Sequence, residues 1–90
     1  MRLDLFLKQS GLVKRRPIAK ALCDGGKIER NGKAAKAGDD VRIGDKLKLH
    51  FGARSVEAEI LTVPERPVGK AERDELFRIT GEERHDDWEF

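Results

Sequence analysis

The sequence predicts an α+β fold in which two short helices precede a series of short strands. Three observations predict it: apolar residues at helical spacing before residue 25, tight-turn dipeptides after it, and alternation of apolar and polar residues over 46–51 and 55–60. The 90 residues are one domain's worth of chain. A domain this small buries only a little over ~60% of its unfolded surface, so we do not expect a deep catalytic cleft.

Two helices are expected. The first, over about residues 2–9, has apolar residues at i, i+3 and i+4, namely Leu3, Phe6 and Leu7. Its first turn holds Asp4, where a negative charge suits the helix dipole. The second, over about 17–24, begins at Pro17, which fits the first helical position. On it Ile18 and Leu22 share one face, with Ala19 and Cys23 beside them, and Gly25 or Gly26 is expected to provide a left-handed end.

Strands and turns follow. Residues 27–30 predict a short strand that leads into Asn31-Gly32, a strong tight-turn dipeptide. Residues 41–43 predict another strand, which precedes a turn at Gly44-Asp45. The clearest element is a hairpin closed on Gly52-Ala53. That closure sets four pairs opposite each other: Phe51 and Arg54, Leu49 and Val56, Lys48 and Glu57, Lys46 and Glu59.

The C-terminal third is less regular. Pro64 and Pro67 are expected to bracket a turn, and residues 70–76 to form a helical turn. Residues 77–80 predict either an added strand or a segment across the core. Residues 82–90 are expected to be a flexible acidic tail. The sequence therefore divides into a main domain over 1–63, an extension over 64–81 that packs on it, and the tail.

Charge is unevenly distributed along the chain. Residues 1–56 hold fourteen Lys and Arg against six Asp and Glu, a net charge of +8. Residues 57–90 hold five against eleven, a net charge of −6, and the two parts give the overall +2. A basic body with an acidic end suits a partner that is a polyanion, because phosphate neutralisation dominates nucleic-acid affinity. Ordinary surface solvation is the alternative interpretation.

The sharpest local signal is the basic run Lys14-Arg15-Arg16 directly before the second helix. Cations there oppose the helix dipole and make poor N-caps, so we expect them to contribute no stability. A phosphate held by the free helix N–H groups and the guanidiniums would resolve the conflict. A solvated charge run is the alternative. Lys20 on the same helix, Lys27 and Arg30 after it, and Arg2 would complete one basic face.

Catalytic, metal and cofactor signals are absent. The single cysteine and two distant histidines give no metal-ligand spacing, and no phosphate-binding glycine motif or nucleophile elbow occurs. We therefore expect no enzyme, no metal and no cofactor. There is no Tyr, and Phe6 and Phe51 are expected in the core, so stacking on single-stranded bases is not favoured. His50 is expected on the polar surface. No signal peptide or membrane span is visible, so we expect a cytoplasmic protein without membrane contact.

Five motifs in order resemble the S-four RNA-binding domain family. They are Arg2-Leu3-Asp4, Lys14-Arg15-Arg16 before Ala19 and Leu22, Gly26-Lys27-Ile28, Asn31-Gly32, and Val41 before Gly44-Asp45. The resemblance covers about residues 1–52 and implies a helix pair packed on a small, mostly antiparallel sheet. It implies RNA contacts at Arg2, Lys14, Arg15, Arg16, Lys20, Lys27, Arg30 and Asn31. One departure is Pro17, since many members have a capping Ser or Thr at or beside this position.

The chain is similar to stand-alone family members that act in bacterial ribosome quality control. The resemblance implies a monomer that binds large-subunit rRNA and peptidyl-tRNA on split, obstructed large subunits. There it would stabilise the P-site tRNA while a partner, a nascent-chain tailing factor, extends the stalled chain. Two alternatives stay open: a ribosome-assembly factor or RNA chaperone that binds rRNA alone, and a detached targeting module of an RNA-modifying enzyme.

Overall fold

The computed structural model describes residues 1–66, 69–73 and 75–84. Two helices open the chain, and a third, single-turn helix precedes the last of five strands. The elements are α1 (Leu3–Ser10), α2 (Arg16–Asp24), β1 (Ile28–Arg30), β2 (Lys33–Ala34), β3 (Lys46–Phe51), β4 (Arg54–Ile60), α3 (Lys70–Arg73) and β5 (Phe77–Arg84). The strands form one sheet in the order β2-β1-β3-β4-β5, and every pairing is antiparallel. The predicted α+β fold, a helix pair on an antiparallel sheet, is confirmed.

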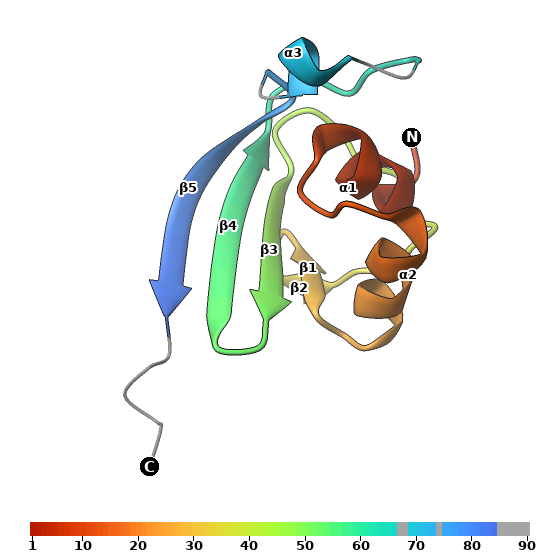
Figure 1. The fold of residues 1–90 in the computed structure, drawn as a ribbon. Helices are drawn as coiled ribbons and strands as arrows, with labels where there is room; N and C mark the ends of the chain where they lie inside the picture. The colour runs from red at the N-terminus through yellow and green to blue at the C-terminus, as the bar shows by residue number, and fades with distance from the viewer. Residues whose placement is uncertain (67–68, 74, 85–90) are drawn as a thin grey trace.

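The helix pair lies on the β1 and β3 side of the sheet, and β5 forms the edge farthest from it (Figure 1). Burial of the apolar stripe of α1 against these strands explains the arrangement, since Leu3, Phe6 and Leu7 are fully buried. From α2 the buried residues are Ala19 and Cys23. The remaining core comes from the sheet, the extension and several loop residues, and its larger members are Ile28, Leu47, Leu49, Ile60 and Leu76.

Phe51, which was expected in the core, is partly exposed, and Ile18 of α2 is exposed as well. Ile18 is 49% exposed, because the face of α2 that meets the core is that of Ala19 and Cys23. Phe51 is 37% exposed at the turn end of the β3–β4 hairpin. Its alternation with polar neighbours is correct. The helix pair lies against other parts of the sheet, so this end of the apolar face stays partly open (Figure 1).

The β3–β4 hairpin has the predicted register, with Phe51 opposite Arg54 and Leu49 opposite Val56. Lys48 forms the expected cross-strand ion pair with Glu57, with an N–O distance of 3.7 Å. Lys46 also stands opposite Glu59, but no ion pair joins these two among the described residues. Instead Arg78 of β5 donates to Glu59 Oε1 at 2.9 Å, because β5 brings a guanidinium to the other side of β4.

The Asn31-Gly32 turn is confirmed, with φ of 54° and 85°, the left-handed values that a tight hairpin turn requires. The turn connects β1 to a strand the sequence did not reveal, β2, which has only two residues. The strand expected over residues 41–43 is absent. There the Asp45 carboxylate accepts the Arg42 N–H at 2.9 Å, which turns the chain before a ladder can form.

The extension adds the last strand, so the first of the two alternatives for residues 77–80 is right. β5 pairs with β4 along its length and reaches Arg84, with one irregularity opposite Glu57 and Ala58. The tail expected from residue 82 is therefore wrong for residues 82–84, which belong to the sheet. Residues 85–90 of that tail and Pro67 of the expected turn lie outside the described residues. α3 ends at Arg73 rather than at residue 76.

Candidate nucleic-acid interface

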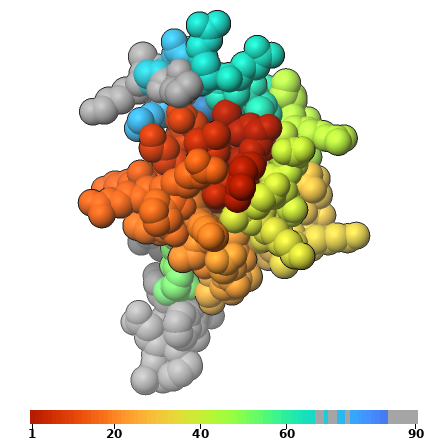
Figure 2. All heavy atoms as spheres, turned by 90° about the vertical axis from the view of Figure 1, so that its right-hand side faces the viewer, coloured from red at the N-terminus to blue at the C-terminus, as the bar shows by residue number. Residues whose placement is uncertain are grey.

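The basic residues singled out in the sequence gather where the two helices begin and where they meet the loop after β2. Figure 2 looks onto this face, which is formed by the chain from α1 through that loop, coloured red to yellow. Six of the predicted contact residues are exposed here or next to it: Arg2, Lys14, Arg15, Arg16, Lys20 and Lys27. We call this surface the helix face.

A groove runs across the helix face between α2 and the loop after β2. Its basic side chains are Arg2, Lys20 and Lys36, and the small residues of 34–38 form much of its wall. Small side chains allow an extended anion to approach the backbone closely. Sequence reasoning missed Lys36, although its position in the Lys33-x-x-Lys36 pair after the Asn-Gly turn was a visible signal.

The helix α2 begins at Arg16, one residue before the predicted start at Pro17, and it lacks a side-chain cap as predicted. Arg15 occupies the N-cap position in an extended conformation, with no side-chain cap, and no acidic residue lies in the first turn. The first N–H groups of the helix therefore face a cluster of cations without a capping oxygen from a side chain. This arrangement favours a bound phosphate over any neutral or cationic ligand.

Arg2 and Arg16 meet at one carboxylate. Asp4, whose side chain is 3% exposed, accepts from Arg2 Nε at 3.2 Å through Oδ1 and from Arg16 Nε at 3.3 Å through Oδ2. The Leu5 N–H also donates to Oδ1, at 2.8 Å. The guanidinium of Arg16 therefore has a contact that the sequence did not predict, an ion pair with a buried carboxylate. Sequence reasoning assigned Asp4 only to the helix dipole.

Arg30 and Asn31 do not line the groove; their side chains bind Asp45 instead. Arg30 Nη1 donates to Asp45 Oδ2 and Asn31 Nδ2 to Asp45 Oδ1, each at 3.1 Å, and the Lys46 N–H donates to Asn31 Oδ1 at 3.0 Å. Burial raises the pKa of Asp45, but the hydrogen bonds from Asn31, the Arg42 N–H and Arg30 outweigh it, so the net shift is downward. These two residues hold the β1–β2 turn onto the start of β3.

The other face of the sheet carries charges of both signs, many of them in cross-strand pairs. His50 Nε2 lies 2.7 Å from Glu29 Oε2, and its Nδ1 lies 3.0 Å from Ser55 Oγ. The Lys48–Glu57 and Arg78–Glu59 pairs continue the ladder. His50 is a partly exposed surface residue, as expected. Because several of its cations pair with neighbouring carboxylates, this face offers a polyanion less than the helix face does.

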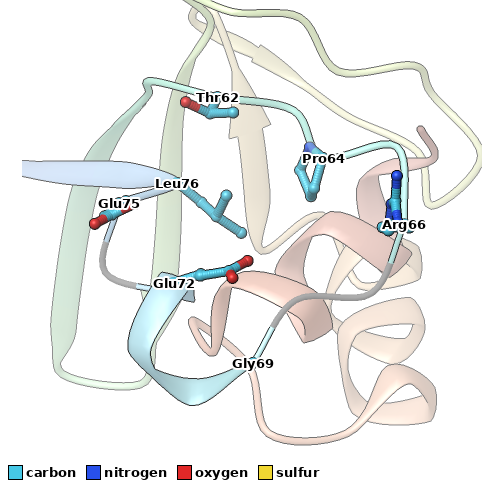
Figure 3. A pocket seen from close by; sticks show the side chains of 7 residues that line it. All are labelled: Thr62, Pro64, Arg66, Gly69, Glu72, Glu75 and Leu76. Carbon is cyan, nitrogen blue, oxygen red and sulfur yellow. The ribbon is translucent and has the colours of Figure 1, made fainter.

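A second hollow lies between the chain after β4 and α3. Figure 3 shows its lining, in which Glu72 and Glu75 are the acidic side chains and Arg66 is the basic one. Two carboxylates against one guanidinium do not suit a phosphate. The hollow also lacks a nucleophile paired with a base. Over residues 1–66, 69–73 and 75–84, no three His, Cys, Asp or Glu side chains cluster as a metal site would require.

Cys23 borders the groove, but its thiol is expected to be unreactive. Burial, and then the nearby Asp4, Asp24 and Asp39 carboxylates, raise the pKa of its thiol to about 11. The thiol is therefore protonated at neutral pH and is a poor nucleophile.

No helix within the described part of the chain has the length and apolar character needed to span a bilayer.

The helix pair, the antiparallel sheet and the basic groove on one side are typical of a small nucleic-acid-binding domain. The family model of the S4 domain matches residues 1–47. The chain belongs to this family. It is 48% identical to the RQC P-site tRNA stabilizing factor of Halalkalibacterium halodurans over 92% of this chain and 93% of that protein. It is 42% identical to the Bacillus subtilis protein of the same name, over 93% and 96%.

A solved structure agrees with the fold. The trimeric structure of Vibrio cholerae Heat Shock Protein 15 superposes with a TM-score of 0.81 at 31% identity, covering 89% of this chain and 81% of that one. The likeness therefore extends beyond residues 1–47 and includes most of the sheet. The resemblance inferred from the five sequence motifs is confirmed.

Proposed function

We propose that this chain is a non-enzymatic RNA-binding factor of bacterial ribosome quality control. It binds large-subunit rRNA and the P-site tRNA on large subunits that still carry peptidyl-tRNA after a stalled ribosome has split. The observation that carries the proposal is the match to RQC P-site tRNA stabilizing factors along nearly the whole of both chains. The one-sided basic groove provides a surface of the right chemistry for that role.

The helix face acts through phosphates. Lys14, Arg15 and Arg16 present cations beside the uncapped start of α2, while Arg2, Lys20 and Lys36 line or border the groove. With Lys27 they form a surface that can follow the backbone of folded RNA. Phe6 is buried and Phe51 lies at the far end of the hairpin, so the helix face has no aromatic platform among the predicted contacts. Recognition by shape and phosphate position follows.

Binding to rRNA and tRNA together would hold the tRNA without any bond being made or broken. Each contact neutralises one phosphate, and several contacts spread over two RNAs resist dissociation of the tRNA from the P site. In this proposal the factor acts as a cytoplasmic monomer, and a separate tailing protein extends the nascent chain. Arg30 and Asn31 support the interface indirectly by fixing the turn beside the groove.

Sedimentation with ribosomes tests the proposal. Tagged protein is mixed with lysates in which translation has been stalled, and its distribution across a sucrose gradient is followed at low and moderate salt. Co-migration with free large subunits is the expected result, and it should be lost when puromycin cleaves the nascent chain from the tRNA and the deacylated tRNA is then washed from the subunits. Migration with small subunits, assembly precursors or free RNA, insensitive to peptidyl-tRNA, would overturn the quality-control function and favour an assembly factor or RNA chaperone.

A further inference from the structure

A buried anion lies within the basic helix face. Asp4 is 2% exposed, yet it is surrounded by residues proposed to bind phosphate. Its charge repels RNA, so on Coulomb's law alone it should weaken binding. The contacts of its carboxylate with two arginines indicate how Asp4 could nevertheless favour RNA binding.

The carboxylate contacts one particular edge of each arginine. Arg2 uses Nε and Nη2, the latter at 3.5 Å, and Arg16 uses Nε. Neither guanidinium has another hydrogen-bond partner within residues 1–66, 69–73 and 75–84. Arg2 Nη1 and both terminal nitrogens of Arg16 are therefore left for a ligand. The two side chains are 52% and 46% exposed, whereas that of Asp4 is 3% exposed, so the open edges point away from the buried carboxylate.

The three residues come together only through the packing of the helices. Arg2 is the N-cap of α1, Asp4 lies in the first turn of α1, and Arg16 is the first residue of α2. Each guanidinium is a long side chain with about four rotatable bonds. Without a partner it would lose that freedom when RNA binds, and this loss weakens affinity.

We propose that Asp4 is a positioning residue for RNA binding: it holds the guanidiniums of Arg2 and Arg16 side by side as a two-pronged ligand for backbone phosphate. The inference rests on the proposed function, because it requires that the helix face binds RNA. Asp4 touches no RNA itself. It offsets its own repulsion by fixing two planar donors in orientations that suit the tetrahedral oxygens of phosphate.

Asp4→Asn in the full chain gives opposite expectations for the two effects. The probe is purified large subunits carrying a P-site tRNA, with the dissociation constant measured over a KCl series at fixed Mg²⁺. Removal of a negative charge alone would tighten binding. We expect binding to weaken about five- to tenfold, as expected when two long side chains lose their immobilisation, and the salt slope to fall by roughly one. Tighter or unchanged binding would overturn the proposal.

Asp24→Asn is the matched control. Asp24 lines the same groove and is exposed, and no described residue pairs with it. It therefore reports the effect of removing one acidic charge without disturbing an arginine. We expect its binding to be equal to or tighter than that of the parent. If both variants weaken binding equally, the effect of Asp4→Asn is not one of positioning.

Arg16→Lys tests the positioning role of Asp4 if Asp4→Asn does not fold. Lysine preserves the charge but has no second edge, so an ammonium that pairs with Asp4 cannot also present a fork to phosphate. We expect Arg16→Lys to bind nearly as weakly as Arg16→Ala. Binding close to that of the parent would refute positioning. If Arg2→Ala and Arg16→Ala both bind as the parent does, the helix face is not the RNA interface. That outcome overturns the proposed interface and not only the positioning role of Asp4.

Discussion

Arg16→Ala removes a guanidinium that stands between a buried carboxylate and solvent, so it should affect both stability and binding. The lost contact is the 3.3 Å bond from Arg16 Nε to Asp4. A hydrogen bond to a charged group contributes ~1.5–3 kcal/mol. Arg16 is 46% exposed, and solvent screening lowers that contribution to ~1 kcal/mol. Asp4 also keeps Arg2 and the Leu5 N–H as donors.

The expected fall in melting temperature follows from this free energy. For a domain of this size, ~1 kcal/mol corresponds to roughly 4–8 °C. Circular dichroism at 222 nm, followed on heating, measures it. The same variant should bind large subunits carrying P-site tRNA roughly ten- to a hundredfold more weakly, because one charge-assisted phosphate contact is lost. The slope of log affinity against log salt should fall by roughly one.

Binding is measured well below the melting temperature of the variant, so that unfolding does not lower the measured affinity. A variant with a lower melting temperature but with the affinity and salt slope of the parent would show that Arg16 is only structural. A variant with unchanged melting temperature would show that the contact between Arg16 and Asp4 contributes nothing to the fold.

Three further predictions follow from other residues. Lys36→Ala in the groove should weaken subunit binding and lower the salt slope by roughly one, whereas Lys48→Ala on the opposite face should bind as the parent does; equal effects would contradict the one-sided interface. The lowered pKa of Asp45 means that its ionised form stabilises the fold above the unfolded value of ~3.9 and that this stabilisation is lost as pH falls through the lower folded pKa. Asp45→Asn should therefore be less stable at pH 7 and show a flatter pH dependence of unfolding in acid, and a variant as stable as the parent would refute this. Cys23, with a pKa of about 11, should react slowly with iodoacetamide at pH 8 and much faster in denaturant, and fast labelling of the folded protein would contradict its burial.

The parts of the fold that sequence predicted correctly depend on short-range patterns. The β3–β4 register followed from alternation within fifteen residues, and the Asn31-Gly32 turn from the backbone preferences of two. The missed features are also local, but they are too short or too irregular for alternation to indicate them. β2 has only two residues and pairs with β1 across the Asn31-Gly32 turn, and the expected strand at 41–43 yields to the Asp45 carboxylate, which takes the Arg42 N–H.

At the site, separation along the chain decided what the sequence could predict. The basic run before α2 and its missing cap are visible in the sequence, because both involve neighbouring residues. The contact between Asp4 and Arg16 spans twelve residues and forms only when the two helix starts meet. The assignment of Arg30 and Asn31 likewise depended on Asp45, which lies fifteen and fourteen residues further along the chain, respectively. Residue type indicated charge correctly, but tertiary packing decided which charges are open to a ligand.

Lysine footprinting on the bound complex tests the central claim most directly. Protein alone and protein on large subunits carrying P-site tRNA are acetylated briefly, and the modified lysines are quantified by mass spectrometry. The helix-face interface predicts protection of Lys14, Lys20, Lys27 and Lys36, with Lys46 and Lys48 of β3 modified as in the free protein. Protection of Lys46 and Lys48 with unchanged labelling of Lys20 and Lys36 would contradict it and place the RNA on the opposite face of the sheet.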